Sequence, residues 1–263
     1  MTTEDQKLPL IFDGHNDILS LLYGKKFQPN CDLSITQFRS GMLGHLDQKK
    51  MTTGGFGGGF FAIWVPSPTN QKQRKDQMQR AQYDLPLPKK IKQRDAVNAT
   101  LGQAAILHKL DQEGLLKICT NSSNISNCLF KGDIAAVMHL EGAEAVDRDF
   151  YILEVLYELG LRSLGPVWSR PNQFGHGVPF RYPSDGDIGP GLTEEGIRLI
   201  QYCDEKGILI DLSHLNEAGF WDVAKHSQKP LIATHSNVHS ISPHSRNLTD
   251  KQLAAIRETN GIV

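Results

Sequence analysis

Short apolar runs recur along the chain, and several of them end abruptly at a histidine or an acidic residue. Residues 10–14 lead into His15 and Asp17, 134–138 into His139 and Glu141, 207–213 into His214, and 230–234 into His235. Apolar runs of this length are typical of strands that are buried on both faces, as in a parallel sheet. The pattern therefore predicts buried strands whose carboxyl ends carry polar side chains.

Segments with helical periodicity alternate with these runs, and such alternation is typical of an α/β fold. The predicted strands cover about 8–13, 58–65, 134–140, 162–168, 207–213 and 230–234, and residues 260–263 have the pattern of one more strand. Helices are predicted over 72–83, 94–113, 149–160, 193–206, 216–226 and 250–259. Thr193 and Thr249 are the expected N-caps of the helices that begin there. Residues 169–192, rich in proline, glycine and aspartate, predict a long loop, and long loops in compact domains are often functional.

The order of these elements favours a TIM-type (β/α)8 barrel. The chain has 263 residues and one such barrel takes ~250, so we expect a single domain over residues 1–263. The strand pattern stops at Val263 after about six strands, whereas a closed barrel needs eight. We therefore expect the barrel to be incomplete, as in a fragment or a truncated product.

The residues at the strand ends have the types that bind a divalent metal. In a barrel of parallel strands the carboxyl ends meet on one face, so residues far apart in sequence would surround one point. His15 and Asp17 are two positions apart on an extended segment, where alternate side chains point to the same side. Glu141 follows a buried strand, where bridging two cations would satisfy both of its oxygens. Imidazole and carboxylate groups without thiolate suit zinc or a similar ion that is held for hydrolysis.

The predicted metal ligands are therefore His15, Asp17, Glu141, His214 and His235, and the carboxylates of Glu141 and Asp17 are also predicted to serve catalysis. His139 and Glu144 compete with Glu141, although His139 lies deeper in its strand and is interpreted as structural. His239 and His244, in the loop after His235, are weaker alternatives. Arg246 follows in the same loop, and we expect it to hold a substrate carboxylate in a two-pronged contact.

Composition narrows the function classes. The net charge is −1, from 28 basic and 29 acidic residues, which gives no support for binding nucleic acid or a membrane surface. The basic stretch from Lys72 to Lys92 is interpreted as a solvated helix and loop. The glycines at 54–59 lack the context of a phosphate-binding loop, and are interpreted as permitting close backbone packing where the second strand enters the barrel.

The chain also lacks a recognisable targeting signal. Residues 1–7 are polar and no apolar segment follows them, so a cytoplasmic location is predicted. Cys119 and Cys128 flank a Ser/Asn-rich segment that is interpreted as a turn. They could pair in an oxidising compartment, but without an export signal we expect reduced thiols.

Taken together, these motifs resemble the membrane dipeptidase (renal dipeptidase) family of metallopeptidases, over almost the whole chain from Phe12 to Val263. The matching stretches are 13–17, 54–66, 140–142, 156–162, 191–193, 211–214, 234–237 and 246–247. The combination is specific, whereas any one stretch alone would not be.

The resemblance implies a barrel of the metal-dependent hydrolase superfamily with two zinc ions, which hydrolyses dipeptides through a water that bridges the metals. A D-residue at the C-terminal position is often tolerated. By position, His15 and Asp17 would bind one zinc, His214 and His235 the other, and Glu141 would bridge them. Arg246 would hold the carboxylate of the dipeptide. A homodimer is a further expectation from the resemblance alone.

Two departures from the family pattern leave alternatives open. Renal-type members have a histidine after the fourth strand that supports the tetrahedral intermediate, and here Trp168 takes that position. His176 in the following loop is a candidate to replace it, so Trp168 and His176 are both predicted to line the substrate site. The family also takes an aspartate from the last strands, and the sequence stops before it. The alternatives to a dipeptidase are a truncated metal-binding barrel with little activity, or a related amidohydrolase that acts on lactams or modified dipeptides.

Overall fold

A computed structural model describes residues 9–24, 33–41, 44–67 and 71–263 of the chain. The chain forms two compact units, Met1–Ile63 with Leu101–Met138, and Trp64–Thr100 with His139–Val263. Residues 1–7, on which the expectation of no targeting signal rests, lie outside the described residues. Within the described ranges, no helix is both long and apolar enough to cross a membrane. The single domain over 1–263 stays a prediction.

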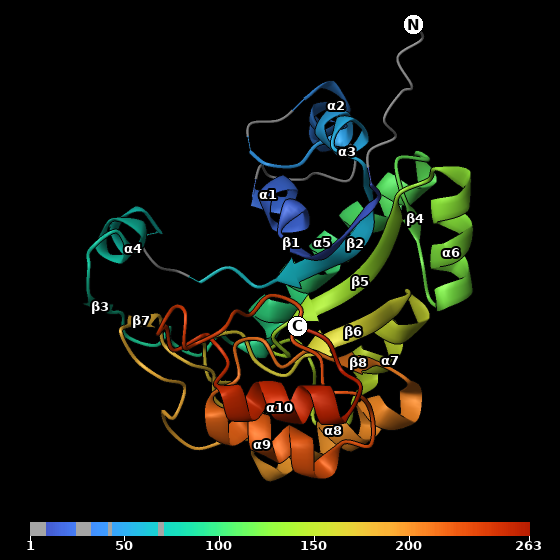
Figure 1. Cartoon of the computed structure of the whole chain (residues 1–263). Helices are drawn as coiled ribbons and strands as arrows, with labels where there is room; N and C mark the ends of the chain where they lie inside the picture. The colour runs from blue at the N-terminus through green and yellow to red at the C-terminus, as the bar shows by residue number, and fades with distance from the viewer. Residues whose placement is uncertain (1–8, 25–32, 42–43, 68–70) are drawn as a thin grey trace, which may run out of the picture. The chain divides into compact units, whose positions relative to one another are not determined.

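The first unit is built on parallel strands. Its strands are β1 (Ile11–Asn16), β2 (Phe56–Trp64, which ends one residue into the second unit), β4 (Lys117–Ile118) and the first part of β5 (Ala135–Glu141). β1 pairs with β2 and β4 pairs with β5, both in parallel. Its helices are α1 (Ile18–Gly24), α2 (Leu33–Ser40), α3 (Gln48–Thr53), α6 (Ser122–Lys131) and most of α5 (Gln93–Gln112). α2 packs against α3 (Figure 1).

The glycines of β2 serve close packing between strands, as predicted. A Cβ atom on Gly58 would lie 2.4 Å from the carbonyl oxygen of Ala135 in β5. A Cβ atom on Gly59 would lie 2.7 Å from the carbonyl oxygen of Asp13 in β1. Real Cβ atoms do not approach backbone this closely, so only glycine lets β2 fit between its neighbours.

The Ser/Asn-rich segment before Cys128 forms helix α6, so its interpretation as a turn is wrong. The side chain of Asn121 accepts a hydrogen bond from the backbone N–H of Asn124, and this cap begins the helix. Cys119 and Cys128 are free thiols, and their sulfur atoms lie 3.6 Å apart. Together with Ala135 they form a small buried cluster.

The second unit begins at Trp64 and holds the end of β5, together with the later elements of the chain. Its strands are β6 (Leu161–Gly165), β8 (Leu209–Ile210) and an antiparallel pair, β3 (Tyr83–Asp84) with β7 (Arg181–Tyr182). Its helices are α4 (Gln71–Met78), the start of α5, α7 (Tyr151–Glu158), α8 (Glu194–Lys206), α9 (Glu217–His226) and α10 (Asp250–Glu258). β6 pairs with β8 in parallel, and α8 lies beside α9 (Figure 1).

Two predicted strands of this unit are shorter in the structure. The run 207–213 forms a ladder only over β8, and 230–234 contributes isolated parallel bridges, from Ile232 to Asp211 and to Ile262. The side chain of Asp211 explains why the ladder ends, because its Oδ1 atom accepts the backbone N–H groups of Ser213 and Thr234. Because these two amides donate to the Asp211 side chain, they are not available for hydrogen bonds between strands.

The predicted helix starts in this unit are confirmed. Thr193 caps α8 by accepting the N–H of Gly196, at 3.0 Å. Thr249 and Gln252 form a capping box at the start of α10. Thr249 follows Arg246 closely in the chain, so its cap fixes the end of the loop that carries Arg246.

Candidate metal centre

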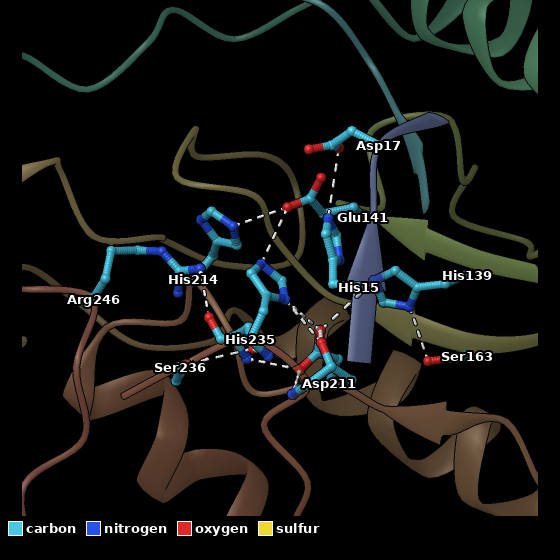
Figure 2. A network of polar contacts seen from close by, with 12 residues as sticks. His15, Asp17, His139, Glu141, Ser163, Asp211, His214, His235, Ser236 and Arg246 are labelled. Carbon is cyan, nitrogen blue, oxygen red and sulfur yellow. Dashed lines mark hydrogen bonds and ion pairs between the residues drawn. The ribbon is translucent and has the colours of Figure 1, made fainter. Parts of the chain in front are cut away.

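Three predicted site residues of the second unit meet at the carboxylate of Glu141, the last residue of β5 (Figure 2). Its Oε1 atom lies 2.9 Å from Nε2 of His214 and 3.4 Å from Nε2 of His235. The two imidazole rings have their centroids 5.0 Å apart. Glu141 and His214 are buried. One carboxylate oxygen thus faces two imidazole nitrogens in a place that is largely shielded from water.

Asp211 lies behind His235 and organises that histidine. Its Oδ2 atom is 3.7 Å from Nδ1 of His235 and accepts a hydrogen bond of 2.6 Å from the hydroxyl of Thr234. Burial disfavours the charged form of Asp211. The charges of His139 and His235 and the hydrogen bonds from Thr234 outweigh burial, and they lower the pKa of this carboxyl to about 2. Asp211 is therefore an anion at ordinary pH.

This network determines which nitrogen of His235 carries the proton. The Thr234 hydroxyl has one hydrogen, and an ionised Asp211 can only accept it. The same hydroxyl lies 2.8 Å from Nδ1 of His235, so it must accept the Nδ1 hydrogen. When the ring is neutral, as a metal-binding imidazole must be, Nε2 is then the acceptor nitrogen, and Nε2 is the atom that faces Glu141.

His214 is held in a comparable way from another segment. Its Nδ1 atom lies 3.0 Å from the hydroxyl of Ser169. Burial, followed by the charge of Arg246, holds the pKa of His214 well below its ordinary value of 6.5. Its backbone φ is +73°, a left-handed conformation that is uncommon for residues other than glycine. Strain of this kind persists where the surrounding structure enforces it, often at functional sites.

Arg246 places a partly buried cation beside the same group. The guanidinium donates a hydrogen bond of 3.3 Å from Nη2 to the carbonyl oxygen of His235, while its Nη1 atom is buried without a hydrogen-bond partner. Within the part of the chain that the structure describes, no carboxylate forms an ion pair with Arg246. Burial lowers its pKa to about 10. A partly buried cation in this condition is well suited to receive an external carboxylate.

The competing candidates have other contacts. Glu144 forms a buried ion pair with Arg170, with 2.7 Å between Oε1 and Nε. His139 is buried, with Nδ1 2.9 Å from the hydroxyl of Ser163 and Nε2 3.6 Å from Asp211, in keeping with its interpretation as structural. In the outer loop, Nε2 of His239 lies 3.0 Å from the carbonyl oxygen of Ser184, and Nδ1 of His244 accepts the N–H of Arg246.

The two residues predicted to line the substrate site differ in position. The Trp168 ring lies next to His214, with 5.8 Å between ring centroids. The imidazole of His176 lies 3.4 Å from the carbonyl oxygen of Gly191. Among the described residues, the imidazole of His176 forms no hydrogen bond, ion pair or ring contact with Glu141, His214 or His235. Its role in replacing the family histidine stays a prediction.

The remaining predicted ligands, His15 and Asp17, belong to the first unit. His15 lies in β1, and its Nε2 atom is 3.6 Å from Oδ1 of Asp17. The side chain of His15 is largely buried, whereas that of Asp17 is 64% exposed. The two side chains do point toward each other, as their i, i+2 spacing predicts. That they share a site with Glu141 stays a prediction.

The donor atoms in the second unit fit a divalent cation. When His235 is neutral, its acceptor nitrogen faces an oxygen of Glu141 at 3.4 Å, and two acceptors in such proximity repel one another unless a cation joins them. Both histidines have their Nδ1 atoms held by hydroxyl groups, which leaves Nε2 directed at the carboxylate. Outer hydrogen bonds of this kind are typical of metal-binding histidines.

Sequence reasoning missed the residues that orient the ligands. Asp211, Thr234 and Ser169 each lie close to a predicted ligand in sequence or in a neighbouring loop, but hydroxyl and carboxylate groups are too common to single out. One signal was present: an aspartate inside an apolar run must be paired when the run is buried. Arg74 of α4 was also missed, because it lies within a polar, basic stretch interpreted as solvated.

Comparison with known proteins agrees with this geometry. The family model for membrane dipeptidase (peptidase family M19) matches residues 5–263. A metallopeptidase from Rhodobacter sphaeroides, solved with a phosphinate mimic of the dipeptide L-Ala-D-Ala, is 45% identical, with a TM-score of 0.91 over 98% of this chain and 73% of its own. This similarity confirms the α/β fold of the TIM-barrel type.

Two curated relatives extend the comparison. An uncharacterized protein in the PQQ-III 3' region of Acinetobacter calcoaceticus is 40% identical over 96% of this chain and 78% of its own length. Dipeptidase verJ of Clonostachys rogersoniana is 27% identical over 97% of this chain and 61% of its own length. With the family model matched over nearly every residue, the chain belongs to the membrane dipeptidase family of metallopeptidases, peptidase family M19.

Proposed function

We propose that this protein is a zinc-dependent dipeptidase with a binuclear metal site. Glu141, His214 and His235 would hold metal in the second unit, and His15 and Asp17 are proposed as further ligands on the resemblance to the family. The dipeptide substrate is proposed from the Rhodobacter relative, whose ligand mimics L-Ala-D-Ala. A cytoplasmic location and a homodimer stay predictions.

The observation that carries the proposal is the convergence of two histidines on one oxygen of Glu141. The distances are 2.9 Å and 3.4 Å, and the tautomer of His235 directs an acceptor nitrogen at that oxygen. Zinc binds neutral imidazole and carboxylate groups in this combination. When bound, the metal pair would supply an activated water and would polarise the peptide carbonyl.

The chain's own residues would bind and orient the dipeptide. Arg246 is partly buried, has a buried Nη1 atom without a hydrogen-bond partner, and lies against the backbone of His235. A substrate carboxylate would satisfy that guanidinium and would place the peptide bond next to the metal ligands. Trp168 adds an apolar surface beside His214, which excludes water from that side of the site.

The test combines metal content with activity in the full chain. Zinc per chain is measured by elemental analysis, and hydrolysis is assayed with L-Ala-L-Ala and L-Ala-D-Ala. We expect about two zinc ions per chain, with turnover that is lost on chelation and restored by zinc. The variant Glu141→Gln is expected to lose both zinc and activity, whereas Glu258→Gln, the same change at an exposed site, should behave as the wild type.

Each outcome separates the alternatives. Zinc binding without turnover of any dipeptide would favour a metal-binding barrel with little activity. Turnover of lactams or modified dipeptides in preference to simple dipeptides would favour a related amidohydrolase. Fewer than one zinc ion in a folded sample would overturn the ligand assignment.

A further inference from the structure

An aromatic wall stands next to His214 in the second unit. The rings of Trp168 and Phe180 lie 5.9 Å apart between centroids. Each of them contacts His214, at 5.8 Å from Trp168 and 6.3 Å from Phe180. We define this wall as Trp168 with Phe180. It is one boundary of the space in which a substrate bound near His214 must lie.

Arg74 lies over both rings of the wall. The central carbon of its guanidinium is 5.8 Å from the Trp168 centroid and 5.3 Å from the Phe180 centroid. Both distances are within the range of cation–π contacts. Arg74 belongs to α4, whose described side chains are mostly exposed, but Arg74 itself is partly buried. Arg74 is thus less exposed than most described side chains of α4, which belongs to the stretch from Lys72 to Lys92 interpreted as a solvated helix and loop.

The charge of Arg74 is not balanced by a carboxylate. In the ranges that the structure describes, no acidic side chain forms an ion pair with Arg74. Arg170 is a contrast, because it lies over Trp168 at 5.2 Å but donates hydrogen bonds to Glu144, Ser67 and the carbonyl of Val65. Arg170 is thus committed to the protein, whereas the guanidinium of Arg74 keeps its hydrogen-bond donors available for a ligand.

Arg74 is placed to bind a side chain of the substrate, because Arg246 would already bind the main-chain carboxylate. A dipeptide spans roughly 7 Å when extended. Arg246 lies against the backbone of His235, where it would take the main-chain carboxylate. Arg74 and His214 contact the same two rings, so a ligand that lies along the wall from His214 comes next to the guanidinium of Arg74. A second arginine in that place can recognise a second carboxylate.

We propose that Arg74 is a specificity-determining residue that binds the side-chain carboxylate of dipeptides containing aspartate or glutamate. This inference rests on the proposed dipeptidase function. The guanidinium lies over the faces of both rings, and its N–H groups remain free to form a paired contact with a carboxylate. Arginine is preferred to lysine for such a contact, because it offers parallel donors and stacks on aromatic rings.

The experiment compares acidic dipeptides with their neutral isosteres. kcat/KM is measured for L-Ala-L-Asp and L-Ala-L-Asn, for the D-configured pair L-Ala-D-Asp and L-Ala-D-Asn, and for L-Asp-L-Ala and L-Asn-L-Ala. We expect Arg74→Met to lower kcat/KM for at least one acidic substrate by about 10–100-fold, and for its amide by less than about threefold. Arg74→Lys should recover part of the loss, because it restores the charge but not the paired donors.

A matched control is available in the same basic stretch. Arg80 follows α4 and is exposed, and Arg80→Met removes the same charge without touching the wall. Binding of a phosphinate mimic of Ala-Asp, measured by calorimetry, should weaken in Arg74→Met by the same factor as kcat/KM, and should not change in Arg80→Met.

The outcomes distinguish this inference from the proposed function. Equal losses for acidic and neutral substrates in Arg74→Met would overturn the inference and would assign Arg74 to packing. No loss for any substrate would overturn it as well. A wild-type chain that hydrolyses neutral dipeptides but rejects acidic ones leaves the dipeptidase function intact and overturns the inference alone. A zinc-loaded wild type that hydrolyses no dipeptide overturns both.

Discussion

Asp211 and His139 lie against each other in the interior of the second unit, with 3.6 Å between Oδ2 and Nε2. Both side chains are almost completely buried. The same carboxylate lies 3.7 Å from Nδ1 of His235, so one anion stands between an imidazole of the core and an imidazole of the candidate metal centre. A structural histidine thereby helps to keep Asp211 charged, and Asp211 in turn sets the tautomer of His235.

The first prediction concerns the variant Asp211→Asn. In asparagine, one of the two terminal atoms is an NH2 group, which cannot accept a hydrogen. If the amide oxygen keeps the backbone N–H groups of Ser213 and Thr234, the NH2 group faces the Thr234 hydroxyl, and that hydroxyl then donates to Nδ1 of His235. The hydrogen of His235 would then move to Nε2, away from the tautomer that binds metal. We expect zinc affinity to fall by about 10–100-fold. A competition titration with a coloured zinc chelator measures this, and ¹⁵N NMR of the imidazoles reports the tautomer.

Asp149→Asn is the control for that variant, because Asp149 is exposed and its side chain forms no hydrogen bond or ion pair with the described residues of the network. It should keep the zinc affinity of the wild type. An Asp211→Asn protein with unchanged affinity and unchanged His235 tautomer would contradict the assignment of Asp211 as the residue that orients His235.

The second prediction is the pH dependence that Asp211 gives to stability. Its pKa is lowered from an ordinary value of 3.8 to about 2 in the folded protein. A lowered carboxyl pKa stabilises the folded state above the unfolded pKa, and this stabilisation is lost as pH falls through the folded pKa. The contribution is about 2 kcal/mol above pH ~4. It should decline between pH ~4 and pH ~2.

Urea unfolding of metal-free protein between pH 6 and pH 3 tests this point. The difference in unfolding free energy between wild type and Asp211→Asn should be constant above pH ~4.5 and should shrink below pH ~4. A difference that stays constant down to pH ~3, while both proteins remain folded, would show that the carboxyl is not charged in the way we describe.

The third prediction tests the hydroxyl that joins Asp211 to His235. Thr234→Val keeps the shape of the side chain but removes both hydrogen bonds, of 2.6 Å to Asp211 and 2.8 Å to His235. We expect a loss of about 1–3 kcal/mol in unfolding free energy, since buried polar groups lose their partner. Zinc affinity should also fall. Thr52→Val, which removes an exposed hydroxyl bond to Gln48, should change neither quantity by a comparable amount.

The fourth prediction concerns the glycine that follows Glu141. Gly142 has a φ of +93°, and a Cβ atom there would lie 2.4 Å from Oε2 of Glu144 and 2.9 Å from the backbone nitrogen of Trp168. Gly207 also has a positive φ, +69°, but a Cβ atom there meets nothing within 4 Å. Both substitutions by alanine carry the conformational cost of a left-handed residue, roughly 1–2 kcal/mol.

Gly142→Ala should be the more damaging of the two, by a further ~1–3 kcal/mol from overpacking. It should also reduce activity, because relief of the clash moves the strand end that carries Glu141. Thermal and urea unfolding of the two variants give the comparison. Equal destabilisation by both alanine substitutions would contradict the prediction that a Cβ atom on Gly142 clashes with its neighbours.

The fifth prediction concerns the buried pair of Arg170 and Glu144. Arg170 is completely buried, and its partner carboxyl has a pKa raised above its ordinary value, chiefly by burial. Arg170→Met would leave Glu144 in the interior without its cation, at a cost of about 3–5 kcal/mol. Arg39→Met, which breaks a surface pair with Glu113, should cost less than about 1 kcal/mol. Similar losses for the two variants would contradict the structural role of the buried pair.

Much of the fold was accessible from the sequence because its causes are local. The apolar runs predicted the buried strands, and Thr193 and Thr249 predicted helix starts that the structure confirms. Prediction failed where a side chain competed with the backbone. Asn121 begins a helix within a segment that resembles a turn, and Asp211 takes amides that a longer strand would have used.

The candidate site divides in the same way. The sequence by itself determined which residue types stand at the strand ends, and this was enough to name Glu141, His214 and His235. Arg246 was named from its place in the loop after His235. Both kinds of prediction depend only on the order of residues along the chain. Only the tertiary structure decided which nitrogen of His235 carries its proton, that Arg246 lacks an ion-pair partner in the described part of the chain, and that Arg74 lies on the aromatic wall. These properties depend on distances between groups far apart in the sequence, and no periodicity along the chain encodes them.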